Sequence, residues 1–193
     1  MVKRSVFCGI TSMVIVLMVW TADAELNNNW LQNIFAQFAD PGITIINSGD
    51  LRATIPRANE DTTRVKMNVR KIRSGRPNDG FAGFCIENRP GPVPLADFQR
   101  VSAMFRTNTV MTVAVKLEKT RHEDGIVWLE NKKRLKIGDN EMQWDLGKSM
   151  DTSTGKATLD EVRRLCVYVT ADRFPAGSNG AILEIGPFSL AKK

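Results

Sequence analysis

The chain has 193 residues, with 27 Lys and Arg against 21 Asp and Glu and a formal net charge of +6. A chain of this length can bury a substantial core in one domain, and no internal repeat or low-complexity tract divides it. It contains no HExxH, CxxC or Gly-x-Ser-x-Gly motif and no phosphate-binding glycine loop. The sequence therefore gives no support to the enzyme classes that carry these motifs.

Residues 1–24 have the layout of a cleavable secretory signal. Lys3 and Arg4 precede an apolar run over residues 6–20, and Ala-Asp-Ala at residues 22–24 stands before a polar Glu25. The apolar run is shorter than the roughly 20 residues that span a membrane. We therefore expect a single mature domain of residues 25–193 with no membrane span, either secreted or periplasmic. An uncleaved anchor is the alternative.

If the protein is exported, its net charge points to different binding partners from those of a cytoplasmic protein. After removal of the leader, 25 basic and 20 acidic residues leave a net charge of +5. Outside the cytoplasm nucleic acid is not an expected partner. A surplus of this size serves solubility, or favours anionic glycans and lipopolysaccharide headgroups. The sequence has no Asn-x-Ser/Thr sequon, which favours a bacterial periplasm or exterior over a eukaryotic one.

The mature chain begins with a helical pattern and continues with strands. Residues 30–38 carry apolar side chains at helical spacing before an Asp-Pro-Gly turn, which predicts one short helix, with Trp30 sealing one end of the fold. The periodicity then changes to two. Turn-forming clusters recur at residues 47–50, 76–80, 88–92, 123–125, 138–140 and 175–180. Such spacing is typical of an all-β sandwich or barrel.

Alternation assigns the faces of several strands. In residues 64–72, Val65, Met67 and Val69 alternate with polar and mostly cationic side chains, so these three should face the core. Two later segments alternate with inward positions at Met111, Val113, Val115 and Leu117, and at Leu165, Val167 and Val169. Residues 182–190 are interrupted by Gly186-Pro187, which indicates an edge strand or a bulge.

Two cysteines, Cys85 and Cys166, remain once the leader with its Cys8 is removed. An even pair in an oxidising compartment predicts one disulfide. Two buried free thiols are the alternative, because Cys is among the most buried residue types.

Five segments resemble, in order, the galactose-binding-like β-jelly-roll of many non-catalytic carbohydrate-binding modules. They are residues 80–86 (GFAGFCI), 95–106 (LADFQRVSAMFR), 140–146 (NEMQWDL), 159–169 (LDEVRRLCVYV) and 183–190 (LEIGPFSL). In that family a Gly-aromatic-Ala-Gly strand is followed by a Leu-x-x-Phe turn, a Trp-x-Leu strand and a Val-x-x-Leu turn. The resemblance covers residues 40–190. It implies an all-β, two-sheet antiparallel jelly-roll sandwich, here with one short N-terminal helix, that binds carbohydrate without turnover.

The resemblance does not extend to a metal site. The family often has an acidic residue in its last strand that helps to hold a structural calcium, and Gly186 stands at that place here. Calcium needs roughly six to eight oxygen ligands. Asp40, Asp50 and Glu184 are the carboxylates that could still contribute. We predict no metal and no other cofactor.

Sugar binding would need an exposed aromatic ring beside polar groups. Trp144 alternates with Met142 and Leu146 and should be core. Trp128 lies between Val127 and Leu129, so its ring should lie on the opposite face, and it is the preferred stacking candidate. Cover for the second sheet or a loop anchor is the alternative role for Trp128.

A cationic strand face is the second candidate. Arg64, Lys66 and Arg70, with Asn68 between them, form a stripe about 20 Å long that could follow an acidic glycan. An ordinary solvated strand, or an edge protected by its charges, is the alternative. The leading hypothesis is a binding protein for a polysaccharide or oligosaccharide, with an anionic polysaccharide as one candidate ligand and with contacts from Trp128 and this stripe.

Two other functions remain open. A structural or envelope protein of the same fold would dock another protein on a sheet face. A polysaccharide lyase or glycoside hydrolase is disfavoured by one His and one Tyr. His122 lies in a charged turn. Tyr168 could serve as a lyase base if it shared a concave face with Arg64 and Arg70, whereas its place in a core-type strand favours structural packing. Tyr168 is also named as a candidate for ligand contact. Carboxylate pairs such as Glu118 with Glu130 or Asp145 carry no weight without a cleft. No catalytic residue is assigned.

Overall fold

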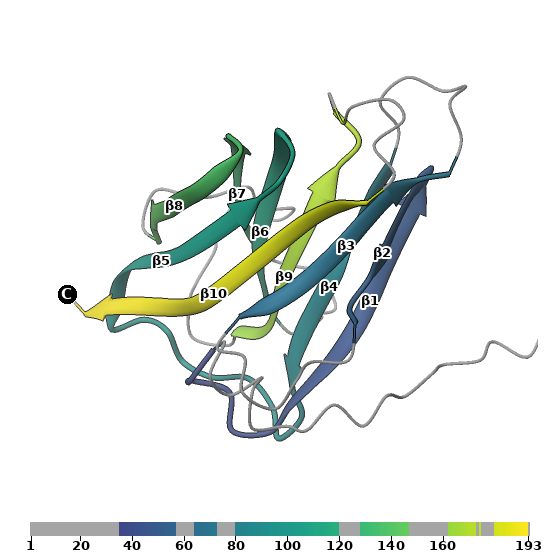
Figure 1. The fold of residues 1–193 in the computed structure, drawn as a ribbon. Coiled ribbons are helices and arrows are strands. Elements are labelled where there is room, and N and C mark those ends of the chain that lie inside the picture. Colours follow the sequence, from purple (N-terminus) through teal and green to yellow (C-terminus); the bar gives the residue numbers. More distant parts are fainter. Residues whose placement is uncertain are drawn as a thin grey trace, which may run out of the picture.

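The computed structural model describes residues 35–56, 64–72, 80–119, 128–146, 162–172, 174 and 180–192. Figure 1 shows the strands in these ranges. Their bounds are β1 Pro41–Gly49, β2 Leu51–Thr54, β3 Val65–Lys71, β4 Gly80–Asn88, β5 Phe98–Thr107, β6 Met111–Lys119, β7 Trp128–Leu135, β8 Gly138–Asp145, β9 Val162–Thr170 and β10 Ala181–Lys192.

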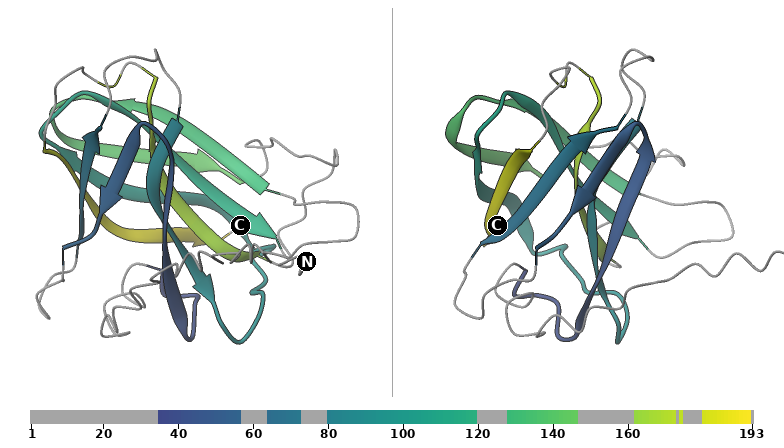
Figure 2. Two further views of the ribbon diagram at one scale, coloured as in Figure 1. Left: turned by 90° about the vertical axis from the view of Figure 1, so that its right-hand side faces the viewer. Right: turned by 45° about the vertical axis from the view of Figure 1, so that its right-hand side comes forward.

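The strands form two antiparallel sheets that pack face to face (Figures 1 and 2). The order is β1-β4-β9-β6-β7 in what we call the first sheet and β2-β3-β10-β5-β8 in the second sheet. The predicted all-β sandwich is thereby confirmed. In the described part of the chain, no helix has the length and apolar character needed to cross a bilayer.

The structure describes only part of the amino-terminal region for which the sequence makes predictions. The signal segment, residues 1–24, and residues 30–34 of the predicted helix, including Trp30, lie outside the described residues. The last part of that segment, residues 35–38, is a turn in which the Phe38 amide donates to the Phe35 carbonyl over 3.0 Å. Phe35 and Phe38 are nevertheless buried, so this turn supplies two rings to the core.

The core fills the space between the sheets because alternate residues of each strand point inward. The predicted inward residues Val65, Met67 and Val69 are buried, and so are the predicted inward positions of β6 and β9. Trp144 is also buried, as expected, with its ring edge-on to Phe188 at 6.3 Å. Strand alternation in the sequence therefore identified the core faces correctly.

The Gly-Pro interruption in β10 is a bulge and not an edge. β10 lies between β3 and β5, and its register with β5 shifts between Ile185 and Phe188. Pro187, which cannot donate a backbone hydrogen bond, sits exposed within this irregularity. Of the two interpretations of this segment, the edge position is wrong.

In the pairing of β4 with β9, Gly83 lies directly opposite Tyr168. A Cβ atom at position 83 would lie 2.1 Å from the Val167 carbonyl oxygen and 2.6 Å from the Tyr168 Cβ. The backbone atoms cannot yield to this contact as a flexible side chain could. Gly83 is therefore required for the position of Tyr168.

Two residues further along β4, Cys85 lies opposite Cys166, and the structure joins them by a disulfide. Their Cα atoms are 4.0 Å apart, and the bridge links positions 81 residues apart in the sequence. The same strand pair is thus held by main-chain hydrogen bonds and by a covalent bond.

Replacing Gly83 tests this close approach. We expect Gly83→Ala to lower the free energy of unfolding by about 3 kcal/mol, because the added methyl group meets backbone atoms. Gly42→Ala is the matched control, since its Cβ would meet only the end of the exposed Arg89 side chain, at 2.9 Å. Urea unfolding measures both. Equal effects for the two variants would contradict the account of Gly83.

Removing the disulfide tests its contribution to stability. We expect the Cys85→Ala/Cys166→Ala variant to lose about 4 kcal/mol of unfolding free energy, because a large closed loop is released in the unfolded chain. Urea unfolding of the oxidised protein, the reduced protein and the variant makes the measurement. If both cysteines of the oxidised protein react as free thiols, the bridge is absent and the expectation fails.

Candidate functional site

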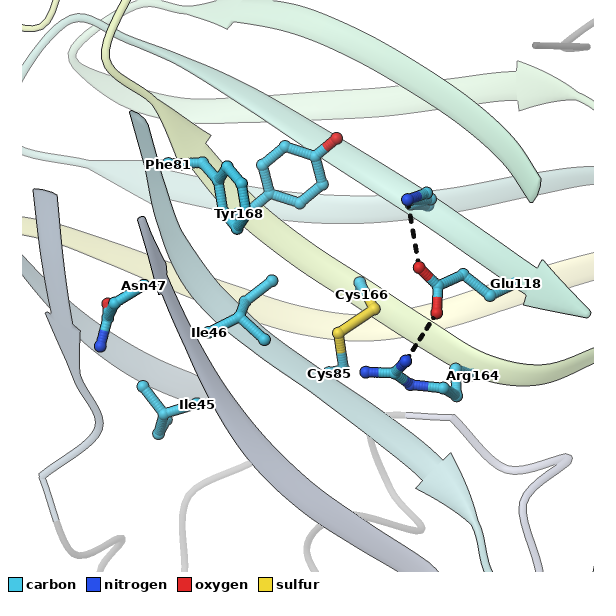
Figure 3. Close-up of a pocket in the computed structure, with 10 residues that line it drawn as sticks. Ile45, Ile46, Asn47, Phe81, Cys85, Glu118, Arg164, Cys166 and Tyr168 are labelled. Carbon is cyan, nitrogen blue, oxygen red and sulfur yellow. Dashed lines mark ion pairs between the residues drawn. A yellow bond between two sulfur atoms is a disulfide. The ribbon is translucent and has the colours of Figure 1, made fainter. Parts of the chain in front are cut away.

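A pocket of about 480 Å³ lies on the outer surface of the first sheet, on the side away from the core. Figure 3 shows the residues that line it: Ile45, Ile46 and Asn47 from β1, Phe81 and Cys85 from β4, Lys116 and Glu118 from β6, and Arg164, Cys166 and Tyr168 from β9. Outward positions of β4, β6 and β9 therefore converge on one site, which residues of the edge strand β1 close on one side. One end is aromatic and the other end is charged.

Two rings form the aromatic end. The centroids of Phe81 and Tyr168 are 5.4 Å apart with an interplanar angle of 57°, and Phe81 is 38% exposed. The Tyr168 hydroxyl donates to Glu130 on β7, whose carboxylate also pairs with Lys132 at 3.1 Å. These contacts orient the Tyr168 ring while one ring of the pair stays open to solvent.

The charged end is organised around Glu118, which is only 8% exposed. One carboxylate oxygen lies 3.1 Å from Lys116 Nζ and the other lies 2.9 Å from a terminal nitrogen of Arg164 (Figure 3). The Glu87 carboxylate lies 4.0 Å from Arg164 Nε and 2.7 Å from Arg163 Nε. Five charged side chains of alternating sign thus run across β6, β9 and β4.

The disulfide Cys85–Cys166 lies between these two ends and forms part of the pocket lining (Figure 3). Both cysteines are almost fully buried. Because they bridge the two central lining strands, the aromatic and charged ends are held at a fixed separation.

The structure does not bring the predicted ligand residues onto one surface. Tyr168 lies on β9 of the first sheet, whereas Arg64, Lys66, Asn68 and Arg70 lie on or just before β3 of the second sheet. Trp128 is the first residue of β7, and its backbone pairs with Glu118. The side chain of Trp128 lies outside what the structure describes. The lining of the pocket thus includes Tyr168 and contains no residue of the cationic strand.

The cationic strand has charge partners of its own. The register places Lys66 beside Glu184, then Arg106 and then Asp139 across four strands of the second sheet. Arg64 also pairs with Glu184 at 3.8 Å. Because β3 lies between β2 and β10, the interpretation of these charges as protection of a sheet edge is wrong.

The residues named for the lyase hypothesis lie on different sheets. Tyr168 is on a different sheet from Arg64 and Arg70, so the arrangement required for the lyase hypothesis is not formed. Glu118 and Glu130 lie on neighbouring strands, and each pairs with a lysine. Carboxylates paired with cations accept hydrogen bonds well.

Two of the three carboxylates named for a metal site, Asp40 and Glu184, pair with arginines. Asp40 lies 3.9 Å from Arg89, and Glu184 pairs with Arg64. Among the described residues, no group of three or more His, Cys, Asp or Glu side chains is placed to hold a metal ion. Gly186 is buried in the bulge of β10 against Met104.

Sequence reasoning missed Phe81, Lys116, Glu118 and Arg164 as site residues. Phe81 belongs to the GFAG segment, whose resemblance to the jelly-roll family implies a fold and names no ligand contact. Alternation in residues 110–117 places Lys116 on the outward side of β6, whereas Glu118 and Arg164 lie just beyond the segments to which alternation assigned faces. A useful signal was therefore present: charged residues on the outward face of two strands whose inward face is wholly apolar.

Comparisons with known proteins agree on the fold. A family 11 carbohydrate-binding module from Clostridium thermocellum, in complex with a β-1,3-1,4-mixed-linked tetrasaccharide, has a TM-score of 0.59 at 7% identity, covering 78% of this chain and 88% of that one. A family 30 carbohydrate-binding module has a TM-score of 0.51 at 12% identity, covering 77% and 91%. An exo-β-agarase has a TM-score of 0.50 at 10% identity, covering 78% of this chain but 23% of the enzyme.

Sequence comparison adds no family assignment. No protein-family model matches the sequence, and no curated protein matches it. At these identities the structural likeness shows the fold alone. The chain has the jelly-roll β-sandwich fold of carbohydrate-binding modules, as the resemblance of its sequence segments predicted.

Proposed function

We propose that this protein binds a glycan, without turning it over, in the pocket on the outer surface of the first sheet. The observation that carries the proposal is the Phe81–Tyr168 ring pair beside the Lys116–Glu118–Arg164 group. Sugar rings stack on aromatic faces, and their hydroxyls both donate and accept hydrogen bonds. The pocket offers both kinds of contact. The similar family 11 module, solved with a tetrasaccharide, supports this function by analogy of fold.

The charges of the lining favour a neutral glycan. Lys116 and Arg164 are both engaged by Glu118, so an acidic sugar would have to compete with an ion pair that is already formed. Hydroxyl groups can add hydrogen bonds to these charged groups without breaking them. An anionic polysaccharide, expected from the net charge, stays a prediction that the same ligand panel tests.

Trp128 extends the proposed site. Its backbone lies opposite Glu118, at the charged end of the pocket. We retain it as a stacking candidate on this placement. Arg64, Lys66, Asn68 and Arg70 belong to the other sheet and are not part of the proposed pocket.

The proposed setting is outside the cytoplasm, either secreted or periplasmic. The Cys85–Cys166 bridge supports it, because stable disulfides form in oxidising compartments. Cleavage after residue 24, leaving one domain of residues 25–193, remains part of this proposal.

Affinity measurements with substituted proteins test the pocket. We expect saturable binding to at least one neutral polysaccharide, and a loss of about tenfold in affinity for Phe81→Ala and for Tyr168→Ala, because each removes a stacking surface. Trp128→Ala should also weaken binding. Isothermal titration against neutral and acidic polysaccharides gives the affinities.

The matched control is a substitution on the other sheet. Met104→Ala removes an apolar side chain that is 43% exposed on β5, and Arg70→Gln removes one charge of the cationic strand. Both should bind as the parent does. Loss of binding in Arg70→Gln with full binding in Phe81→Ala would move the site to the second sheet and refute the pocket.

A further inference from the structure

The turn between β7 and β8 presents an apolar tip on a basic hairpin. Ile137 is 68% exposed, which is the highest value for any large apolar side chain in the described part of the chain. Lys132, Lys133, Arg134 and Lys136 precede it, and all four are exposed. A single exposed apolar residue on a protein surface needs no explanation. An exposed apolar residue that is held at the tip of a basic turn needs one.

The turn is built to hold this residue outward. Lys136 donates its amide to Asn140 Oδ1 over 3.0 Å, and Asn140 Nδ2 donates to the carbonyls of Lys136 at 2.8 Å and Gly138 at 2.9 Å. Gly138 has a φ of 95°, a backbone conformation that residues with a side chain rarely adopt. Leu135, at the base of the turn, is fully buried. The tip is therefore held in place by the buried Leu135 on one side and by the hydrogen bonds of Asn140 on the other.

Some of the hairpin charges are already used. Lys132 pairs with Glu130, and Lys133 donates to the Glu141 carbonyl. On β8, Asp139 lies beside Arg106 by register. Arg134 and Lys136 flank the tip on the side of β7, and no ion pair engages either of them within the described residues. They are available to an external anion.

We propose that the β7–β8 turn docks the protein on an anionic lipid surface, with Ile137 inserted among the acyl chains and Arg134 and Lys136 against the headgroups. Cations near an anionic bilayer gain electrostatic free energy, and an apolar side chain gains by leaving water. A polyanionic glycan would satisfy the two cations but offers no apolar interior to Ile137. The exposed isoleucine therefore favours lipid.

The tip is separate from the glycan pocket. None of residues 132–138 lines the pocket, although β7 belongs to the same sheet. Docking through the turn would leave Phe81 and Tyr168 accessible. Lipid binding and glycan binding can accordingly be measured independently, and either can fail without the other.

Vesicle sedimentation tests the proposal. The protein is used in the form in which it is exported, and intact-mass measurement establishes which residues that form contains. Vesicles of phosphatidylcholine with phosphatidylglycerol should bind the protein, and vesicles of phosphatidylcholine alone should bind it much less. Ile137→Ser should lower the partition coefficient about tenfold, and Lys136→Gln about fivefold. Dextran sulfate serves as the polyanion without an apolar interior.

Matched controls lie elsewhere on the surface. Met104→Ser removes another exposed apolar side chain, and Arg100→Gln removes another exposed cation, both on β5. Both should partition as the parent does, and circular dichroism should show all variants folded. The proposal is overturned if anionic vesicles do not bind the protein, if Ile137→Ser binds them as the parent does, or if the controls lose as much. Binding to dextran sulfate with no binding to vesicles overturns it in favour of a glycan partner.

Discussion

The register between β4 and β9 is the constraint on which the rest of the first sheet depends. It sets Gly83 opposite Tyr168 and Cys85 opposite Cys166. Because side chains alternate with a period of two, a slip of one residue would turn the apolar side of the slipped strand to solvent. It would also separate Phe81 on β4 from Tyr168 and Arg164 on β9, since the two strands would then present these residues on opposite faces. Gly83 makes this register sterically possible, and the disulfide then fixes it covalently.

The two outer surfaces of the sandwich have different chemistry. The first sheet carries a ring pair, and its nearly buried Glu118 holds two cations in place. The second sheet carries exposed charges that alternate in sign from strand to strand, from Lys66 through Glu184 and Arg106 to Asp139. Paired charges on an open surface contribute little to affinity or stability. A pocket with aromatic and polar walls is the better binding surface.

Sequence alone predicted the fold better than the site, for a physical reason. Alternation is local, so it placed Val65, Met67, Val69 and Trp144 in the core and Tyr168 on an outward face. Strand order is not local. Nothing in residues 64–72 indicates that β3 belongs to a different sheet from β9, and so the predicted site joined residues that the fold separates. Phe81 was missed because a Gly-rich segment next to a disulfide cysteine is equally consistent with packing.

Mapping the ligand contact by nuclear magnetic resonance is the most direct test of the central claim, that the outer surface of the first sheet is the recognition surface. Amide chemical shifts of isotope-labelled protein would be followed during titration with the polysaccharide that binds best. The account predicts that the largest changes occur at Phe81, Lys116, Glu118 and Tyr168 and their neighbours on β4, β6 and β9. Changes concentrated at Arg64, Lys66 and Arg70, with these strands unaffected, would contradict it.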